Sequence, residues 1–223
     1  MVYADVEAWT NHLADRLAAE GYREVPHPLG TDQPGLRAFR RRDFRVSWVL
    51  TQLHTFVVVQ AVPQANGLAV LEFMRHAVPW AKSVKGGLPV GLQTGLVVIA
   101  VTATERAQED AMHAATAAQQ KMWAAKPISV VVDVAMQRAY TASGNMLWGA
   151  AYQDFLGEQQ ELIVAGTGAH TLASGGRHGG RSVLGVAMSV FLVLAFAFIL
   201  VKLLADVRGQ STGATMGPWR RTP

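Results

Sequence analysis

The feature that most restricts how this chain can fold is an apolar run near its C-terminal end. Residues 182–201 read SVLGVAMSVFLVLAFAFILV, twenty residues without a charged side chain. As an α-helix this run would be about 30 Å long, which matches the hydrocarbon core of a bilayer. A buried helix of a water-soluble domain usually keeps one polar face. We therefore predict a transmembrane helix over residues 182–204, followed by a short basic tail over residues 205–223.

The distribution of charge separates this C-terminal part from the rest of the chain. The formal net charge is +4, but residues 1–180 contain 15 basic and 15 acidic side chains. The surplus comes from basic residues that flank or follow the apolar run: Arg181, Lys202, Arg208, Arg220 and Arg221. A protein that binds nucleic acid concentrates its basic charge on the folded domain. We therefore expect no nucleic-acid partner.

Two signals for membrane orientation disagree. More basic residues follow the apolar run than precede it, which favours a cytoplasmic tail under the positive-inside rule. Residues 1–7, MVYADVE, have neither the basic start nor the apolar core of a signal peptide, which favours a cytoplasmic N-terminal domain. We expect a single-pass protein with a C-terminal anchor and its N-terminal domain in the cytoplasm.

A glycine-rich segment precedes the apolar run. Residues 166–180 contain six glycines and show no apolar periodicity, so we predict a flexible tether over residues 166–181 and a soluble domain over residues 1–165. A flexible chain of this length has a reach of about 20 Å. His170 and His178 lie in the tether without a neighbouring carboxylate, and the chain has no cysteine, so we expect no metal site there.

The pattern of apolar residues in the domain predicts a mixed α/β fold. A first helix is capped by Asp5 and ends at Gly21, and its apolar face is formed by Val6, Trp9, Leu13 and Leu17. Strand-like runs follow at Leu36–Arg41, Phe44–Thr51 and Thr55–Val62. Two helices then alternate with apolar strands at Leu96–Thr102 and Ile128–Val134. This order predicts an antiparallel hairpin region, then two βαβ crossovers with packed helices, and a last amphipathic helix that includes Phe155.

Polar residues at the ends of the predicted parallel strands are the first candidates for a ligand site. Ligands of open α/β sheets usually bind at the carboxyl ends of the strands, where this chain places Gln60, Gln64, Thr104, Glu105 and Asp133. Thr104 is also a plausible N-cap of the following helix. Asp133 lies at the end of the apolar run VVVDV and would need a partner or a raised pKa if buried, but an aspartate that faces water or caps a turn explains it equally well.

Arginines form the densest charged cluster of the domain. Arg37, Arg40, Arg41, Arg42 and Arg45 fall within nine positions, and we expect residues 40–43 to form a hairpin tip. Guanidinium groups there could bind anionic lipid headgroups or carboxylates of a partner protein, while a solvated turn is the alternative.

The predicted span offers one candidate surface for packing against another helix. Gly185 and Ser189 are small residues four positions apart, and Ala197 lies further along the same general face. The span contains no histidine that could ligate haem iron or a chlorin magnesium, and no charge that could line an ion path.

The sequence contains no motif that identifies a chemical reaction, and its patterns favour a non-catalytic role over an enzyme or sensor. The motif GQSTG at Gly209–Gly213 matches G-x-S-x-G, but it follows a membrane span instead of a sheet strand, so we expect it to arise by chance. We predict no catalytic residue, metal or cofactor. The leading hypothesis is a membrane-anchored accessory or scaffold subunit of a larger membrane complex, with membrane-protein subunits and membrane lipid as partners. The alternative is a membrane-tethered enzyme or ligand sensor that uses Thr104, Glu105 and Asp133.

Overall fold

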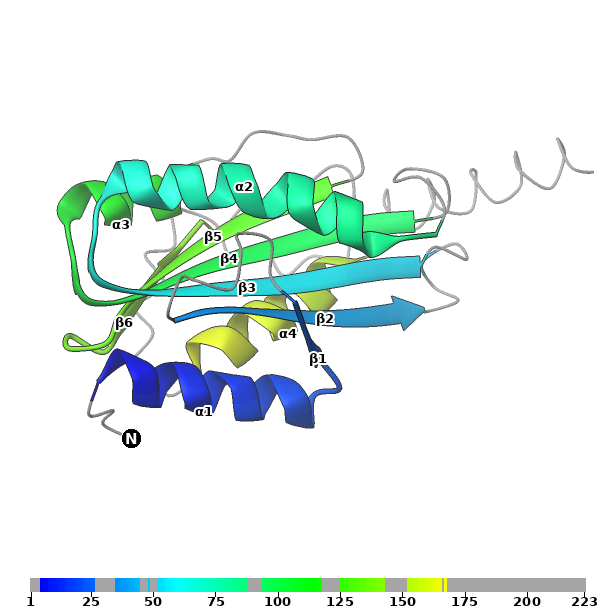
Figure 1. The fold of residues 1–223 in the computed structure, drawn as a ribbon, viewed down its shortest axis with the longest axis horizontal. Helices are drawn as coiled ribbons and strands as arrows, with labels where there is room; N and C mark the ends of the chain where they lie inside the picture. Colours follow the sequence, from blue (N-terminus) through cyan, green and yellow to red (C-terminus); the bar gives the residue numbers. More distant parts are fainter. Residues whose placement is uncertain are drawn as a thin grey trace, which may run out of the picture. The chain divides into compact units, whose positions relative to one another are not determined.

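The structure is a computed structural model of the chain and describes residues 5–26, 35–44, 48, 52–87, 94–117, 125–142, 152–165 and 167. These residues form an α/β fold, a mixed six-stranded sheet with four helices packed on it (Figure 1). In chain order the elements are α1 (Val6–Ala19), β1 (Arg23–Val25), β2 (Leu36–Phe44), β3 (Gln52–Ala65), α2 (Gly67–Lys85), β4 (Thr94–Ala107), α3 (Glu109–Thr116), β5 (Ala125–Asp133), β6 (Arg138–Thr141) and α4 (Gln153–Val164).

The strands lie in the sheet in the order in which they occur in the chain. β1, β2 and β3 are antiparallel neighbours, β3, β4 and β5 run parallel, and β6 returns antiparallel to β5. The helices α2 and α3 provide the crossovers that parallel neighbours require. The predicted antiparallel region followed by two crossovers is therefore confirmed. The short edge strands β1 and β6 have no counterpart in the sequence prediction.

Helix α1 forms as its sequence indicates. The side chain of Asp5 caps the helix by accepting the main-chain N–H of Ala8 at 2.7 Å. The predicted apolar face is buried along its length: Val6, Trp9, Leu13 and Leu17. Gly21 follows the helix with a φ of +83°, a conformation that glycine adopts without strain, so the chain can turn there into β1.

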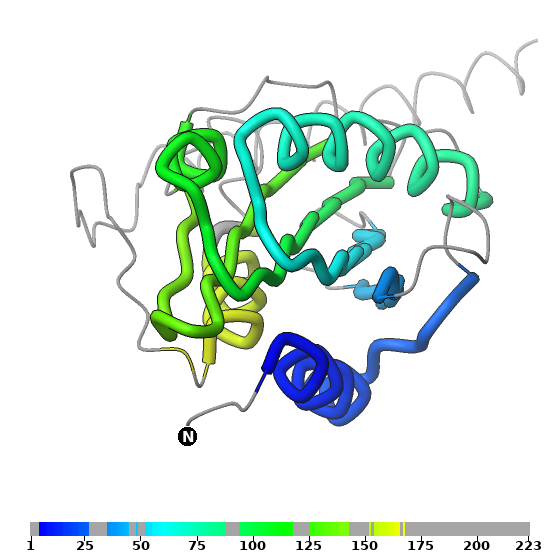
Figure 2. Tube along the Cα trace, turned by 60° about the vertical axis from the view of Figure 1, so that its left-hand side comes forward, coloured from blue at the N-terminus to red at the C-terminus, as the bar shows by residue number. Residues whose placement is uncertain are grey.

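Helices cover both faces of the sheet. α2 and α3 pack on one face, and α1 and α4 pack on the other (Figures 1 and 2). Successive side chains of β3 alternate between the two layers, with Val57 and Val59 in the α1–α4 core and Phe56 and Val58 in the α2 core. Burial on both faces explains why the parallel strands read as continuous apolar runs.

The arginine-rich segment does not form the hairpin tip that the sequence predicts. Residues 40–43 lie inside β2, where Arg40 pairs with Phe56 and Asp43 pairs with Leu53 on β3. Of the predicted strand Phe44–Thr51, Phe44 instead ends β2 and Trp48 lies outside the sheet, while the other six residues lie outside the described part of the chain. The strand continues because the guanidinium groups find carboxylates, aromatic rings or helix carbonyls on its two faces, as described below.

The second crossover also differs from the prediction. β4 extends to Ala107, so Thr104 lies in a strand and is not a helix N-cap; the N-cap of α3 is Gln108. The next strand, β5, contains Pro127, which lies opposite Val98 of β4. This position tolerates proline because β6 pairs with β5 only from Val130 onward, leaving the other side of Pro127 without a strand of the described sheet.

The C-terminal predictions fall outside the described residues. This applies to the tether over 166–181 apart from Thr167, to the span over 182–204, and to the tail over 205–223. Within the part that the structure describes, no helix has the length and apolarity needed to cross a membrane.

Gly35 tests the fit between β2 and β3. Its φ is +85°, and a Cβ added there would lie 2.8 Å from the Cβ of Ala61, whose N–H donates to the Gly35 carbonyl. Gly35→Ala should therefore lower the free energy of unfolding by about 2 to 4 kcal/mol. Gly87→Ala is the matched control because its φ is +69° with open space around the added Cβ, so it should cost only about 1 kcal/mol. Equal losses in urea unfolding would show that the close contact with Ala61 is unimportant.

Candidate functional site

The structure brings two of the strand-end candidates together. Thr104 of β4 lies directly opposite Asp133 of β5 and opposite Val62 of β3, so Thr104 and Asp133 share the α2–α3 face of the sheet. Both side chains are fully buried, with 0% and 2% exposure. Buried polar groups at this edge must find partners, and those partners decide whether the edge can bind a ligand.

Asp133 uses both carboxylate oxygens to hold main chain in place. Oδ2 accepts the N–H of Ala107 at 3.0 Å, and Oδ1 accepts the N–H of Met136 at 2.8 Å. The first bond joins the ends of β4 and β5, and the second closes the turn into β6. The capping role that the sequence offered for Asp133 is therefore the one observed.

Thr104 joins the ends of β3 and β4 in a similar way. Its Oγ1 lies 3.1 Å from the carbonyl oxygens of Pro63 and Arg106, and it accepts the N–H of Arg106 at 3.2 Å. Gln60 is also engaged, because its side-chain Nε2 donates to the Oγ1 of Thr102 at 2.8 Å. The polar side chains of this edge therefore stabilise the strand ends.

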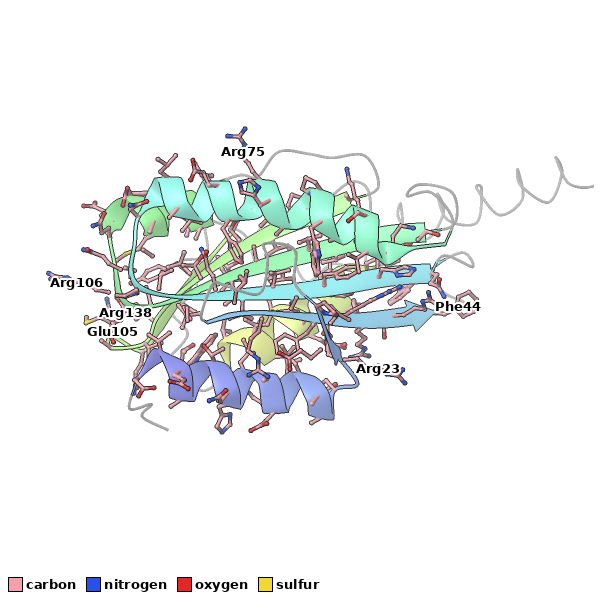
Figure 3. The ribbon with its side chains drawn as sticks, in the orientation of Figure 1. Arg23, Phe44, Arg75, Glu105, Arg106 and Arg138 are labelled. Carbon is pink, nitrogen blue, oxygen red and sulfur yellow. The ribbon has the colours of Figure 1, made fainter. Side chains whose placement is uncertain are left out.

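The remaining polar residues of this edge are exposed and belong to its outer surface. Glu105, Arg106 and Arg138 lie at the same end of the sheet, and Figure 3 shows Arg106 projecting away from the body. Glu105 is exposed whereas the carboxylate of Asp133 is buried, so the two acidic side chains do not face a common pocket. A hollow formed by described residues lies elsewhere, on the outer face of α2, and is lined by Glu72, Arg75 and His76. Among the described residues, no group of three His, Asp or Glu side chains could hold a metal ion.

Two members of the arginine cluster face α1 and are held in ion pairs. Arg37 makes two hydrogen bonds to Glu24, at 2.8 and 2.9 Å, and a third to Asn11 at 3.2 Å. The charge-assisted bonds to Glu24 raise the pKa of Arg37 and lower the pKa of Glu24.

Arg41 is the second of these. Its guanidinium lies 2.8 Å from Asp43 and 3.6 Å from Glu20, and it stacks near the rings of Tyr22 and Phe155. Arg37 and Arg41 thus connect β2 to β1, α1 and α4. Their charges are compensated within the protein, so the prediction that they form part of a surface for an external anion is not supported by these contacts.

Arg40 faces the opposite layer and caps the end of α2. Its guanidinium donates to the carbonyl oxygens of Lys85 at 2.7 Å and of Val84 at 3.4 Å, and it lies 3.1 Å from the Nδ1 of His54. The carbonyls at a helix C-terminus lack intrahelical partners and carry partial negative charge, so a cation there is stabilising. This contact fixes the last turn of α2 beside β2.

His54 lies at the centre of this cationic end and was not among the sequence candidates. Its side chain is 1% exposed, and burial together with Arg40, Arg42 and Lys85 lowers its pKa from 6.5 to about 4. Its Nε2 lies 3.2 Å from the side-chain oxygen of Gln52. No sequence motif marks His54, because the residues that surround it belong to β2 and α2. Both elements lie ten or more residues from His54 in the sequence.

The last member described is Arg42, whose side chain is exposed on the same side of β2 as Arg40. Arg45 lies outside the described residues, as do Gly185, Ser189 and Ala197 of the predicted packing face. The structure thus divides the predicted arginine patch between the two faces of β2.

With this geometry known, comparison with other proteins adds no relative. No protein family, curated protein or solved structure matches the chain.

The double acceptor role of Asp133 makes a direct prediction. Asp133→Asn should lower the free energy of unfolding by about 2 kcal/mol, because an amide provides one acceptor oxygen and turns an NH₂ toward a main-chain N–H. Glu105→Gln, an equivalent change at an exposed position of the neighbouring strand β4, should stay within about 0.5 kcal/mol of the wild type. Urea unfolding followed by fluorescence of the buried Trp9 and Trp48 measures both. A stable Asp133→Asn protein would contradict the structural role.

His54 makes stability depend on pH in a defined direction. Between pH 6.5 and about 4 the unfolded chain binds a proton at this position that the folded protein does not, so stability is fully present above pH 6.5 and falls as the pH drops. The melting temperature should fall less between pH 7 and pH 5 in His54→Gln than in the wild type. His113→Gln, at an exposed position of α3, is the control and should keep the wild-type fall. An unchanged fall in His54→Gln would show that another group causes the pH dependence.

Proposed function

We propose that the protein is a membrane-anchored, non-catalytic accessory or scaffold subunit of a larger membrane complex. It contributes one transmembrane helix, residues 182–204, and an α/β interaction domain that the tether keeps near the bilayer. Other membrane-protein subunits are its principal partners, and membrane lipid is a second. The proposal places the domain on the cytoplasmic side.

The observation that supports this proposal most strongly is the use of the polar groups at the strand ends. In an enzyme or sensor with this kind of sheet, the carboxyl edge is where a ligand would bind. Here the side chains of the buried Asp133 and Thr104 form hydrogen bonds to main-chain groups of the same edge. Asp133 is also only 2% exposed, so it presents almost none of its surface to a substrate at this edge.

The apolar run supports the membrane part of the proposal. Its twenty uncharged residues are enough to cross a bilayer, and the basic surplus of the chain lies around it. Burial against lipid tails gives little driving force for helix association, so membrane helices associate where small residues allow close packing. Gly185, Ser189 and Ala197 provide such residues in this span.

Substitutions in the span test the proposed mode of association. Gly185→Leu with Ser189→Leu should abolish recovery of partner subunits after purification in mild detergent while the protein stays inserted, because the larger side chains prevent close helix packing. Val183→Leu with Ala187→Leu, on the opposite side of an ideal helix, is the matched control and should retain the partners.

Glu105→Gln distinguishes the alternative function. This substitution is expected to leave the fold intact. Because the scaffold proposal gives Glu105 no role, partner recovery and cellular function should also be unchanged. Loss of cellular function in Glu105→Gln at normal abundance and with normal assembly would refute the scaffold proposal and favour an enzyme or sensor. Normal assembly of the Gly185→Leu, Ser189→Leu protein would refute the proposed packing face.

A further inference from the structure

One end of the sheet combines cations with exposed apolar side chains. The end of β2 contributes Arg42 and Phe44, and the last turn of α2 contributes Lys82 and Val84. Phe44 is 55% exposed and Val84 is 36% exposed, while Arg42 and Lys82 are also exposed. We call these four side chains the β2–α2 surface. Lys82 and Val84 are two positions apart and lie on opposite sides of the last turn of α2, so the surface surrounds this end of the helix.

Arg40 holds the two parts of this surface together. Its hydrogen bonds to the carbonyls of Val84 and Lys85 fix the end of α2 against β2, two residues before Arg42 and four before Phe44. Figure 3 shows Phe44 projecting at the end of β2, on the side of the molecule where α2 also ends. The surface is therefore formed by two elements that are far apart in the sequence but fixed relative to each other.

Among the described residues of this end, the exposed cations are not neutralised by Asp43, the carboxylate next to Arg42 in the sequence. Asp43 lies between Arg42 and Phe44 in the chain but turns to the opposite face of β2, where it pairs with Arg41 at 2.8 Å. The cations of the end also act on one another, because the charge of Arg42 adds to burial in lowering the pKa of Arg40 and of Lys85. An external anion would relieve this repulsion.

Support of the α2 C-terminus accounts for only part of this arrangement. Arg40 donates to the helix carbonyls, and Lys85 Nζ donates to the carbonyl of Gly86. That role does not explain why an exposed phenylalanine stands beside the exposed Arg42. Large exposed apolar side chains next to basic ones are typical of surfaces that lie in the headgroup region of a membrane.

We propose that the β2–α2 surface docks the domain on an anionic phospholipid bilayer, with Arg42 and Lys82 at the lipid phosphates and Phe44 and Val84 inserted at the headgroup boundary. The inference rests on the proposed membrane anchor, which keeps the domain within reach of the bilayer, and it adds the orienting surface and the lipid class. Docking fixes which face of the domain points away from the membrane, and so leaves the carboxyl edge with Arg106 and Arg138 for other contacts.

The absence of cysteine from the chain makes a site-specific test practical. The full-length protein carries one cysteine, Ser83→Cys on the last turn of α2 or Ala135→Cys in the turn after β5, labelled with a polarity-sensitive dye. It is reconstituted into phosphatidylcholine vesicles with or without about one-third phosphatidylglycerol. A nitroxide-labelled lipid reports whether the dye lies at the bilayer. We expect quenching at position 83 only in the anionic vesicles and no quenching at position 135 in either.

Charge reversal tests the role of the cations. Arg42→Glu with Lys82→Glu should reduce the ratio of docked to undocked protein about thirtyfold or more, because each cation near an anionic surface contributes about fivefold. Arg106→Glu with Arg138→Glu is the matched control, with the same change of charge at the other end of the sheet, and should dock as the wild type. Phe44→Ser, which changes no charge, should also weaken docking. Circular dichroism confirms that each variant is folded.

Flotation after a high-pH wash separates this proposal from the anchor on which it rests. Loss of the protein from the vesicles would refute the membrane anchor. Retention of the protein with an unquenched dye at position 83 in anionic vesicles would refute docking alone and leave the membrane anchor intact. Quenching that is equal in both lipids, or that survives Arg42→Glu with Lys82→Glu, would also refute docking on anionic lipid.

Discussion

The burial of three parallel strands on both faces is the constraint on which the rest of the structure depends. β3, β4 and β5 bring apolar side chains to both sides of the sheet, so helices must cover both, and the two crossover helices can cover only one. The other face requires α1 and α4, from the two ends of the described chain. Arg16 of α1 donates hydrogen bonds to the carbonyls of Leu162 and Ala165 at the end of α4, and Tyr22, which follows α1, donates to the side chain of Gln159 in α4.

The same burial determines which hydrogen-bond partners the polar residues at the two ends of the sheet must have. At the carboxyl edge, Asp133 and Thr104 are enclosed by the layers and bind main-chain groups, which prevents unsatisfied donors and acceptors in the interior. At the amino edge, Arg40 and the neutral His54 take the equivalent positions under the end of α2. One edge is thus closed by a carboxylate and a hydroxyl, and the other by a guanidinium. This difference leaves positive charge at the amino edge and makes it the better candidate for an anionic partner.

The sequence predicts those parts of the fold that depend on local pattern. The cap at Asp5, the apolar face of α1 and the alternation of strands and helices after Thr55 all follow from neighbouring residues. It does not predict β1 or β6, because three or four residues at a sheet edge carry too little periodicity. The hairpin assigned to residues 40–43 is wrong because consecutive charges suggest a turn, whereas their partners Glu24, Asp43 and the end of α2 come together only in the fold.

The candidate site shows the same limit. The strand-end rule correctly places Thr104 beside Asp133, but pattern alone cannot show that both side chains are already satisfied. His54, Phe44 and Val84 carry no motif, and their importance depends on burial, exposure and the approach of α2 to β2.

The central claim is that the α/β domain folds independently and that the C-terminal segment attaches it to the membrane. A chain that ends at Gly180 tests this claim most directly. It should remain in the supernatant after a high-salt wash of membranes, which removes any docking through surface charge, and it should unfold cooperatively in urea. The full-length chain should stay in the membrane pellet under the same conditions. Retention of the shortened chain in the pellet after the wash, or loss of its cooperative unfolding, would contradict the account.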